Sequence, residues 1–300
     1  MKRETPLTLW HLIAPLPATA IGAMVMRFSG ISPSVWLQNL VATALALVLI
    51  TPLWLRGVKK RPSTLSIRCV AVACIVLLAL TVTQPSVEGV HRWIRLGAFS
   101  LHAGALVLPV LLVLGFALGS RWSAVIGALV AAILFIQPDA GQAFAFAAGW
   151  IVVSLRNRDP WARCSIAVVI LAAVGVLLRG DDLQPVPHVE GIVGLARELG
   201  SVWLVAAILS LALPPVALVF DPDRRTTFAI GLYVAATLLA AWIGHFPVPF
   251  MGHGVSPILG YYFALGTLLW VNGEAARCVA ESTVSVHSRT ETTGRTSIRD

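Results

Sequence analysis

TTFAIGLYVAATLLAAWIGHFPVPFMGHGVSPILGYYFALGTLLWVNG, residues 226–273, contains no Asp, Glu, Lys or Arg. This run is long enough for two membrane-spanning helices, because each needs roughly 20 apolar residues. Between them lie the prolines and glycines of 247–257, which predict a tight or re-entrant loop. Irregular backbone is tolerated at membrane depth only where it lines a cavity or is buried in protein. A plain rigid turn is the alternative interpretation.

The rest of the 300-residue chain has the same character, with 57% hydrophobic and only 12% charged residues. A soluble domain needs more polar residues to cover its surface. The sequence therefore predicts an all-α polytopic membrane domain over 1–279 and a disordered cytoplasmic tail over 280–300. Ten spans are expected in this helical bundle, at about 8–26, 35–55, 68–85, 100–118, 122–137, 141–155, 163–179, 199–220, 227–246 and 256–273. Pro109 and Pro214-Pro215 are expected to break or kink the fourth and eighth spans.

The basic residues predict how these spans are oriented. With the N-terminus inside, 17 of the 22 Lys and Arg fall in cytoplasmic segments and 5 fall outside. Cytoplasmic loops carry such an excess, so both termini are expected in the cytoplasm. This bias also explains the net charge of +8, and no nucleic-acid partner is expected.

Polar residues collect in the segments assigned to the outside. Arg92 and Arg95 flank Trp93 in the segment after the third span. Two arginines there can bind phosphate by charge-assisted hydrogen bonds. The alternative is an ordinary interfacial anchor, which is common at the ends of spans.

Two outer segments carry carboxylates. Asp139 follows Gln137 in the turn between two spans, where it can contact a ligand or cap the next helix. Glu190 follows His188 within Arg179–Gly200, the most polar stretch between apolar spans. A carboxylate near a histidine at a membrane surface can act as a general base. The alternative is a solvated loop acid.

Taken in order, four stretches resemble motifs of the SEDS family, the FtsW/RodA/SpoVE-type polytopic proteins of bacterial cell-wall synthesis. HRWIRLG at 91–97 is similar to Arg-Arg-Trp-Ile-x-Leu-Gly, and QPDAG at 137–141 to Gln-Pro-Asp-Leu-Gly. HVE at 188–190, followed by RELG at 197–200, is similar to His-Thr-Asp followed by Glu-Glu-Leu-Gly. PFMGHGVS at 249–256 resembles Pro-Phe-x-Ser-Tyr-Gly-Gly-Ser. The resemblance covers nearly the whole chain.

The resemblance implies a peptidoglycan glycosyltransferase that polymerises lipid II, a polyprenyl pyrophosphate-linked disaccharide, during cell division or cell-shape maintenance. It would work at the outer face of the bacterial inner membrane beside a class B penicillin-binding protein. Glu190 stands where the family has its essential aspartate and is the expected catalytic residue, although an ungapped register puts Val189 there. The substrate-binding residues expected from the motifs are Arg92, Arg95, Gln137, Asp139, His188, His253 and Ser256. No cofactor is assigned, and a divalent metal is left open.

Departures from the family pattern keep other functions open. Residues 102–105, His-Ala-Gly-Ala, replace Gln-Pro-Ser-Glu, and Leu108 replaces a lysine. The loop before His188 is also shorter. Whether the chain is an enzyme is therefore open, and the alternative is a non-catalytic relative that binds lipid II or acts as a scaffold. A lipid flippase is a further alternative, although the near absence of ionisable residues within the spans argues against ion-coupled transport.

Overall fold

The computed structural model describes residues 7–58, 60–86, 89–97, 99–156, 159–179, 185–221, 225–244 and 246–273. The predicted tail at 280–300 lies outside these ranges. In chain order the helices are α1 (Leu9–Ile13), α2 (Leu16–Phe28), α3 (Pro33–Arg56), α4 (Thr64–Leu80), the 3-10 helix η1 (Thr81–Thr83), α5 (Ala103–Ala117), α6 (Ser120–Ile136), α7 (Ala140–Leu155), α8 (Pro160–Arg179), α9 (Ile192–Leu199), α10 (Ser201–Val219), α11 (Arg225–Ile243) and α12 (Val255–Asn272).

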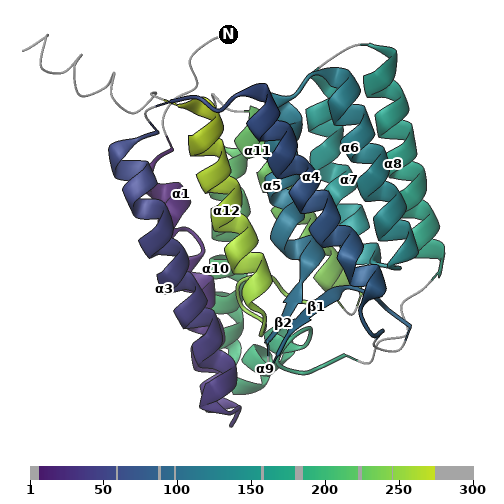
Figure 1. Ribbon diagram of the computed structural model, residues 1–300. Helices are drawn as coiled ribbons and strands as arrows, with labels where there is room; N and C mark the ends of the chain where they lie inside the picture. The colour runs from purple at the N-terminus through teal and green to yellow at the C-terminus, as the bar shows by residue number, and fades with distance from the viewer. Residues whose placement is uncertain are drawn as a thin grey trace, which may run out of the picture.

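The helices form the predicted polytopic bundle (Figure 1). Within the described ranges, 7 helical stretches are at least 18 residues long and apolar enough to cross a membrane. The shorter apolar helices α5, α6 and α7 have 15, 17 and 16 residues. Together these stretches lie at the ten predicted span positions, with α1 and α2 sharing the first. The sequence pattern therefore located the apolar helices of the bundle correctly.

Helix α5 lies at the centre of the bundle and packs against α4, α7 and α12. Almost all of its side chains are buried, including Leu108, Leu111 and Leu112. Its approach to α12 is close because Gly260 has no side chain: a Cβ there would lie 2.1 Å from the carbonyl oxygen of Ala105. Small residues commonly allow such close helix packing in membranes.

The outer surface of the bundle is apolar. Large hydrophobic side chains such as Val48 on α3, Leu171 on α8 and Leu209 on α10 are well exposed. In a soluble protein such extensive apolar exposure would be a liability. Here it fits helices that face the hydrocarbon of a bilayer.

A short β-hairpin precedes α5 at the lower end of the bundle in Figure 1, which we call the hairpin end. Strand β1 (Trp93–Leu96) pairs with β2 (Phe99–His102) in antiparallel register, so that Trp93 is opposite His102. Helix α5 begins directly after β2. The predicted span at 100–118 is thus helical only from residue 103, because its first residues are tied to β1.

The helix breaks predicted at Pro109 and Pro214-Pro215 do not occur. Helix α10 continues through Pro214 and Pro215, and α5 continues through Pro109. Neighbouring groups can satisfy the freed carbonyls of such helices within a membrane. The first span is instead divided before Leu16, where hydroxyls of Tyr261 and Tyr262 donate 2.8 Å hydrogen bonds to carbonyls at the end of α1.

Candidate functional site

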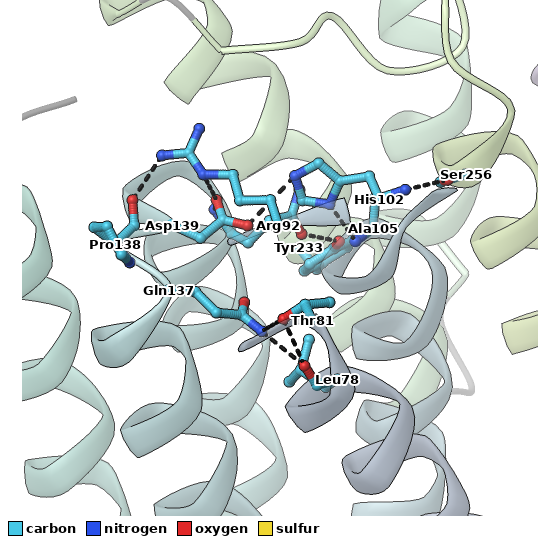
Figure 2. A network of polar contacts seen from close by, with 11 residues as sticks. Leu78, Thr81, Arg92, His102, Ala105, Gln137, Pro138, Asp139, Tyr233 and Ser256 are labelled. Atoms are coloured by element: carbon cyan, nitrogen blue, oxygen red, sulfur yellow. Dashed lines mark hydrogen bonds and ion pairs between the residues drawn. The ribbon is translucent and has the colours of Figure 1, made fainter. Parts of the chain in front are cut away.

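A buried polar cluster lies at the hairpin end, where β1, β2 and the α6–α7 turn meet (Figure 2). Nε of Arg92 is 3.6 Å from Oδ1 of Asp139, and Nε2 of His102 is 3.4 Å from Oδ2 of the same carboxylate. The side chains of Arg92 and Asp139 are 3% and 2% exposed. Buried charges are tolerated when they are paired in this way. We call Arg92, His102 and Asp139 the buried cluster.

The turn between α6 and α7 positions Asp139. Nε2 of Gln137 donates hydrogen bonds to the carbonyl of Leu78, at 2.8 Å, and to Oγ1 of Thr81, at 2.5 Å, which ties the turn to the end of α4. Oδ1 of Asp139 accepts a 3.3 Å hydrogen bond from the backbone N–H of Gln142. The interpretation of Asp139 as a helix cap is therefore confirmed, and the same carboxylate also faces Arg92.

Arg92 links the hairpin to this turn. Its Nη2 donates a 2.6 Å hydrogen bond to the carbonyl of Pro138, and its own carbonyl accepts a 3.0 Å bond from the backbone N–H of Ala103. These contacts occupy parts of the guanidinium and backbone that a surface anchor would expose to water. Arg92 therefore lies inside the protein rather than at the lipid–water interface.

His102 joins the cluster to α12. Its backbone N–H donates a 2.8 Å hydrogen bond to Oγ of Ser256, at the start of α12. Its Nδ1 accepts a 3.3 Å bond from the N–H of Ala105, so it caps α5. With Nδ1 acting as an acceptor, the neutral ring carries its proton on Nε2, which lies 3.4 Å from Oδ2 of Asp139.

A second polar contact joins α11 to the start of α7. Oη of Tyr233 on α11 donates a 2.5 Å hydrogen bond to Oε1 of Gln142 (Figure 2). Gln142 lies in the first turn of α7, and its backbone N–H is the group that Asp139 caps. Tyr233 thereby ties α11 to the helix start that holds the buried cluster.

Glu190 lies in a tight turn before α9. Its Oε2 accepts a 2.8 Å hydrogen bond from the backbone N–H of Val186. The carbonyl of Val186 in turn accepts the N–H groups of Val189 and Glu190, at 2.9 and 3.1 Å. The side chain is half-buried. The Glu190 carboxylate thus stabilises the turn in which it lies.

This turn, residues 185–191, docks on residues 246–254, and we call the two segments the loop pair. The N–H of His253 donates a 2.8 Å hydrogen bond to the carbonyl of His188, and the two imidazoles are 5.9 Å apart. The N–H of Val248 donates a 3.3 Å bond to the carbonyl of Val189. A Cβ at Gly252 would lie 2.2 Å from that same carbonyl oxygen, so only glycine permits this approach.

Asn39, a buried residue within α3, holds the second segment of the loop pair. Its Nδ2 donates a 2.8 Å hydrogen bond to the carbonyl of Gly252, and its Oδ1 accepts a 3.2 Å bond from the N–H of Gly254. The ring of His253 also contacts the carbonyl of Val35, with 3.2 Å between Nδ1 and oxygen. Irregular backbone near the membrane therefore has its polar groups satisfied by a neighbouring helix, as such backbone requires.

Replacing Asn39 with Ala is expected to loosen the loop pair. The change leaves two backbone groups near Gly252 and Gly254 without partners, and each unsatisfied buried group costs about 1–3 kcal/mol. Hydrogen exchange of the amides at 251–255 should accelerate. Asn39→Asp keeps an acceptor for Gly254 but places a buried carboxylate oxygen against the Gly252 carbonyl, so it should not restore the slow exchange. Equal exchange in all three proteins would show that Asn39 does not hold the loop.

Two histidines of the site, His102 and His253, have pKa values below the ordinary imidazole value. Burial lowers the pKa of His102, and the nearby Arg92 lowers it further, while Asp139 opposes the shift. Burial also lowers the pKa of His253; its contact with the Val35 carbonyl opposes this, and His188 adds to the lowering. Both imidazoles therefore favour the neutral form in the folded protein.

Stability is expected to fall on acidification below about pH 6.5, the ordinary imidazole pKa. In that range the unfolded chain takes up protons that the folded protein resists, so the free energy of unfolding decreases as pH falls. Thermal unfolding of the purified protein between pH 7.5 and 5.5 measures this. In His102→Gln, the free energy of unfolding should depend less strongly on pH. The pH dependence that remains is due partly to His253. An identical pH dependence in the variant contradicts the assignment to His102.

The structure brings the sequence-predicted residues into two neighbouring groups. Arg92, Gln137, Asp139 and Ser256 lie in or next to the buried cluster, and His188, Glu190 and His253 lie in the loop pair. Ser256 follows the loop pair directly at the start of α12, so the two groups are joined through the backbone. Arg95 is exposed on β1, opposite Ser100.

Sequence reasoning missed three residues with positioning roles. His102 stood only as a departure from the family pattern, and histidine is not among the residues that usually cap a helix. Asn39 is a polar residue inside an apolar span, and such residues usually face the protein interior. No local sequence pattern indicates the role of Tyr233, because its partner Gln142 lies 91 residues away along the chain.

Within the described ranges, no group of three or more His, Cys, Asp or Glu is placed to hold a metal ion. His188 and His253 face each other, but no set of protein ligands for a divalent ion is identified there.

Comparisons with known proteins show the fold. The chain matches no protein-family model and no curated protein. It is similar to the rod-shape-determining protein RodA of Thermus thermophilus, with 21% identity and a TM-score of 0.64 over 88% of this chain and 96% of that chain. An aspartate-to-alanine mutant of that protein matches with 20% identity and a TM-score of 0.64 over the same shares.

A third similar structure is a chain of a peptidoglycan synthase complex described as coordinating polymerization and crosslinking. It matches with 20% identity and a TM-score of 0.63 over 89% of this chain and 98% of that chain. At these identities the likeness establishes a RodA-like polytopic membrane fold for nearly the whole length of the chain.

Proposed function

We propose that the chain is a divergent SEDS protein of bacterial cell-wall synthesis and a peptidoglycan glycosyltransferase that polymerises lipid II. One observation carries the proposal. The four stretches that resemble SEDS motifs, spread over residues 91–256, meet at one end of a bundle with the RodA fold. That end is proposed to face outward from the inner membrane, with both termini in the cytoplasm, in keeping with the distribution of Lys and Arg.

The residues at this end suit the chemistry. Glycosyl transfer to an acceptor hydroxyl requires a base, and Glu190 is a half-buried carboxylate on a braced turn. The leaving pyrophosphate requires cationic donors, for which Arg95 is exposed on the hairpin. Arg92, buried against Asp139, positions the hairpin. The exposed apolar faces of the helices are proposed to contact the polyprenyl chain.

The test is polymerisation of lipid II by the purified protein, with and without a class B penicillin-binding protein. Such a partner is proposed because one similar structure belongs to a complex described as coordinating polymerization and crosslinking. We expect glycan chains to form, with a higher yield when the partner is present. Lipid II binding without polymer under either condition would contradict a glycosyltransferase.

One observation favours a second candidate, a non-catalytic lipid II-binding or scaffolding relative. Ala105 and Leu108, which replace a family glutamate and lysine, are 4% and 0% exposed and pack in the centre of the bundle. The site therefore lacks two charges that the resemblance implies. Complementation of a SEDS-deficient strain separates the candidates, because a scaffold complements equally well with Glu190 or Gln at that position.

A further inference from the structure

Two arginine–tryptophan pairs lie at the end of the bundle opposite the hairpin, where α4, α6 and α8 begin. Cζ of Arg68 is 4.5 Å from the ring centre of Trp122, and Cζ of Arg121 is 5.9 Å from that of Trp161. Arg121 and Trp122 are consecutive in α6, so the pairs form one strip across the three helices. The tryptophans are 40% and 50% exposed. Their position suits the boundary between lipid headgroups and hydrocarbon.

The strip retains unused donors and positive charge. A guanidinium over an indole uses its face for the cation–π contact, which leaves its edge N–H groups available. Nε of Arg68 is buried without a hydrogen-bond partner among the described residues, so the Nη groups are the ones that can reach a headgroup. The nearby carboxylate, Asp159, accepts hydrogen bonds from the side chain of Ser120 and from the α8 start, which lower its pKa. Asp159 is therefore ionised, and the two positive charges of Arg68 and Arg121 exceed its single negative charge.

Apolar side chains continue from the strip along the same helix faces. They follow the arginines and tryptophans at intervals of three, four, seven or eight residues, which places them on one side of each helix. They are well exposed, so they are open to acyl chains. These side chains are Val72 and Val76 on α4, Val125 and Leu129 on α6, and Val168 on α8.

We propose that this strip binds the phosphate headgroup of an anionic phospholipid, whose acyl chains lie along the exposed apolar faces of α4, α6 and α8. The guanidinium edges provide charge-assisted hydrogen bonds to phosphate, and the indoles lie at headgroup depth. A soluble phosphate compound would use the arginines but leave the apolar faces uncovered. The site lies at the opposite end from Glu190, so it does not depend on the proposed glycosyltransferase activity.

Native mass spectrometry of the purified protein with added phosphatidylglycerol tests the proposal. The double variant Arg68→Gln, Arg121→Gln should bind this lipid roughly thirtyfold more weakly, which corresponds to about 2 kcal/mol for the lost charge-assisted hydrogen bonds to phosphate. The matched control is Arg56→Gln with Arg225→Gln. It removes two exposed charges at the same end of the bundle, from α3 and α11. Because salt screens exposed charges that do not contact the phosphate, this control should bind within about twofold of the unmodified protein.

Equal weakening in both double variants would overturn the proposal, because net charge alone would then explain binding. Unchanged binding in both would also overturn it and leave the pairs as membrane anchors. Displacement of the lipid by inorganic phosphate alone would contradict the role of the acyl chains. If the double variant does not fold, each single variant should still bind roughly fivefold more weakly, half of the same free energy, and unchanged binding in both singles would count against the site.

Discussion

Replacing Glu190 with Gln is expected to abolish lipid II polymerisation. A positioned general base contributes roughly 10²- to 10⁴-fold to rate, and the amide cannot accept the proton. Gln retains the size of the side chain and an oxygen that can accept the N–H of Val186, so the turn should keep its conformation. Single-turnover polymerisation with labelled lipid II measures the loss. Lipid II binding should stay close to that of the unmodified protein.

Glu190→Asp is the matched control, because it keeps the charge. It withdraws the carboxylate by about the length of one carbon–carbon bond, and a misplacement of about 1 Å can cost on the order of 10²-fold. We expect reduced but measurable polymerisation. If the unmodified protein and Glu190→Gln are indistinguishable in polymerisation and in complementation, Glu190 is a solvated loop acid. The glycosyltransferase proposal would then give way to the scaffolding relative.

The second large effect is expected for Asp139→Asn. The amide has nearly the same shape and can still cap α7 through its oxygen, so the change mainly removes the negative charge facing Arg92. Removing one partner of a buried ion pair costs about 3–5 kcal/mol. Unfolding of the purified protein should therefore occur at a clearly lower temperature, with the hairpin and the start of α7 losing protection from hydrogen exchange first.

Glu198→Gln serves as the control for Asp139→Asn. Glu198 is exposed on α9 at the same end of the bundle, and removal of an exposed charge usually changes stability by no more than about 0.5 kcal/mol. A similar small effect at Asp139 would mean that its charge is not needed for stability. The buried cluster would then be better described as a hydrogen-bonded cap.

The positions of the spans could be predicted because charge and hydropathy are local properties. The charge-free run at 226–273 contains α12 and nearly all of α11, with the loop at 246–254 between them. The hairpin was not predicted, since its four-residue strands are too short to show an alternating pattern. The division of the first span into α1 and α2 was not expected, although Pro15 and Pro17 lie at the division and proline removes a helical donor. The partners of the freed carbonyls, Tyr261 and Tyr262 of α12, could not be read from the local sequence.

The site could be predicted in its residue types but not in its geometry. Arg92 and Asp139 were both expected to contact substrate, whereas their side chains face each other inside the protein. No local pattern reports that pairing, because the two residues lie on separate turns that only the packed bundle brings together. Asn39 is a similar case: its partners Gly252 and Gly254 are more than 200 residues away along the chain. The turn that carries Glu190 packs against the segment that Asn39 holds, so its position depends on these distant contacts as well.

The shortness of helix α6 has a consequence for the surrounding bilayer. Its 17 residues extend about 26 Å at 1.5 Å per residue, less than the roughly 30 Å of a typical hydrocarbon core. Trp122 near its start and Ile136 at its end both face outward, so lipid can contact the outward face of α6 along its whole length. Hydrophobic mismatch of this kind is relieved by local thinning of the membrane. We expect the bilayer to be thinnest beside α6, where headgroups of the hairpin-end leaflet are drawn toward the α6–α7 turn that holds Asp139.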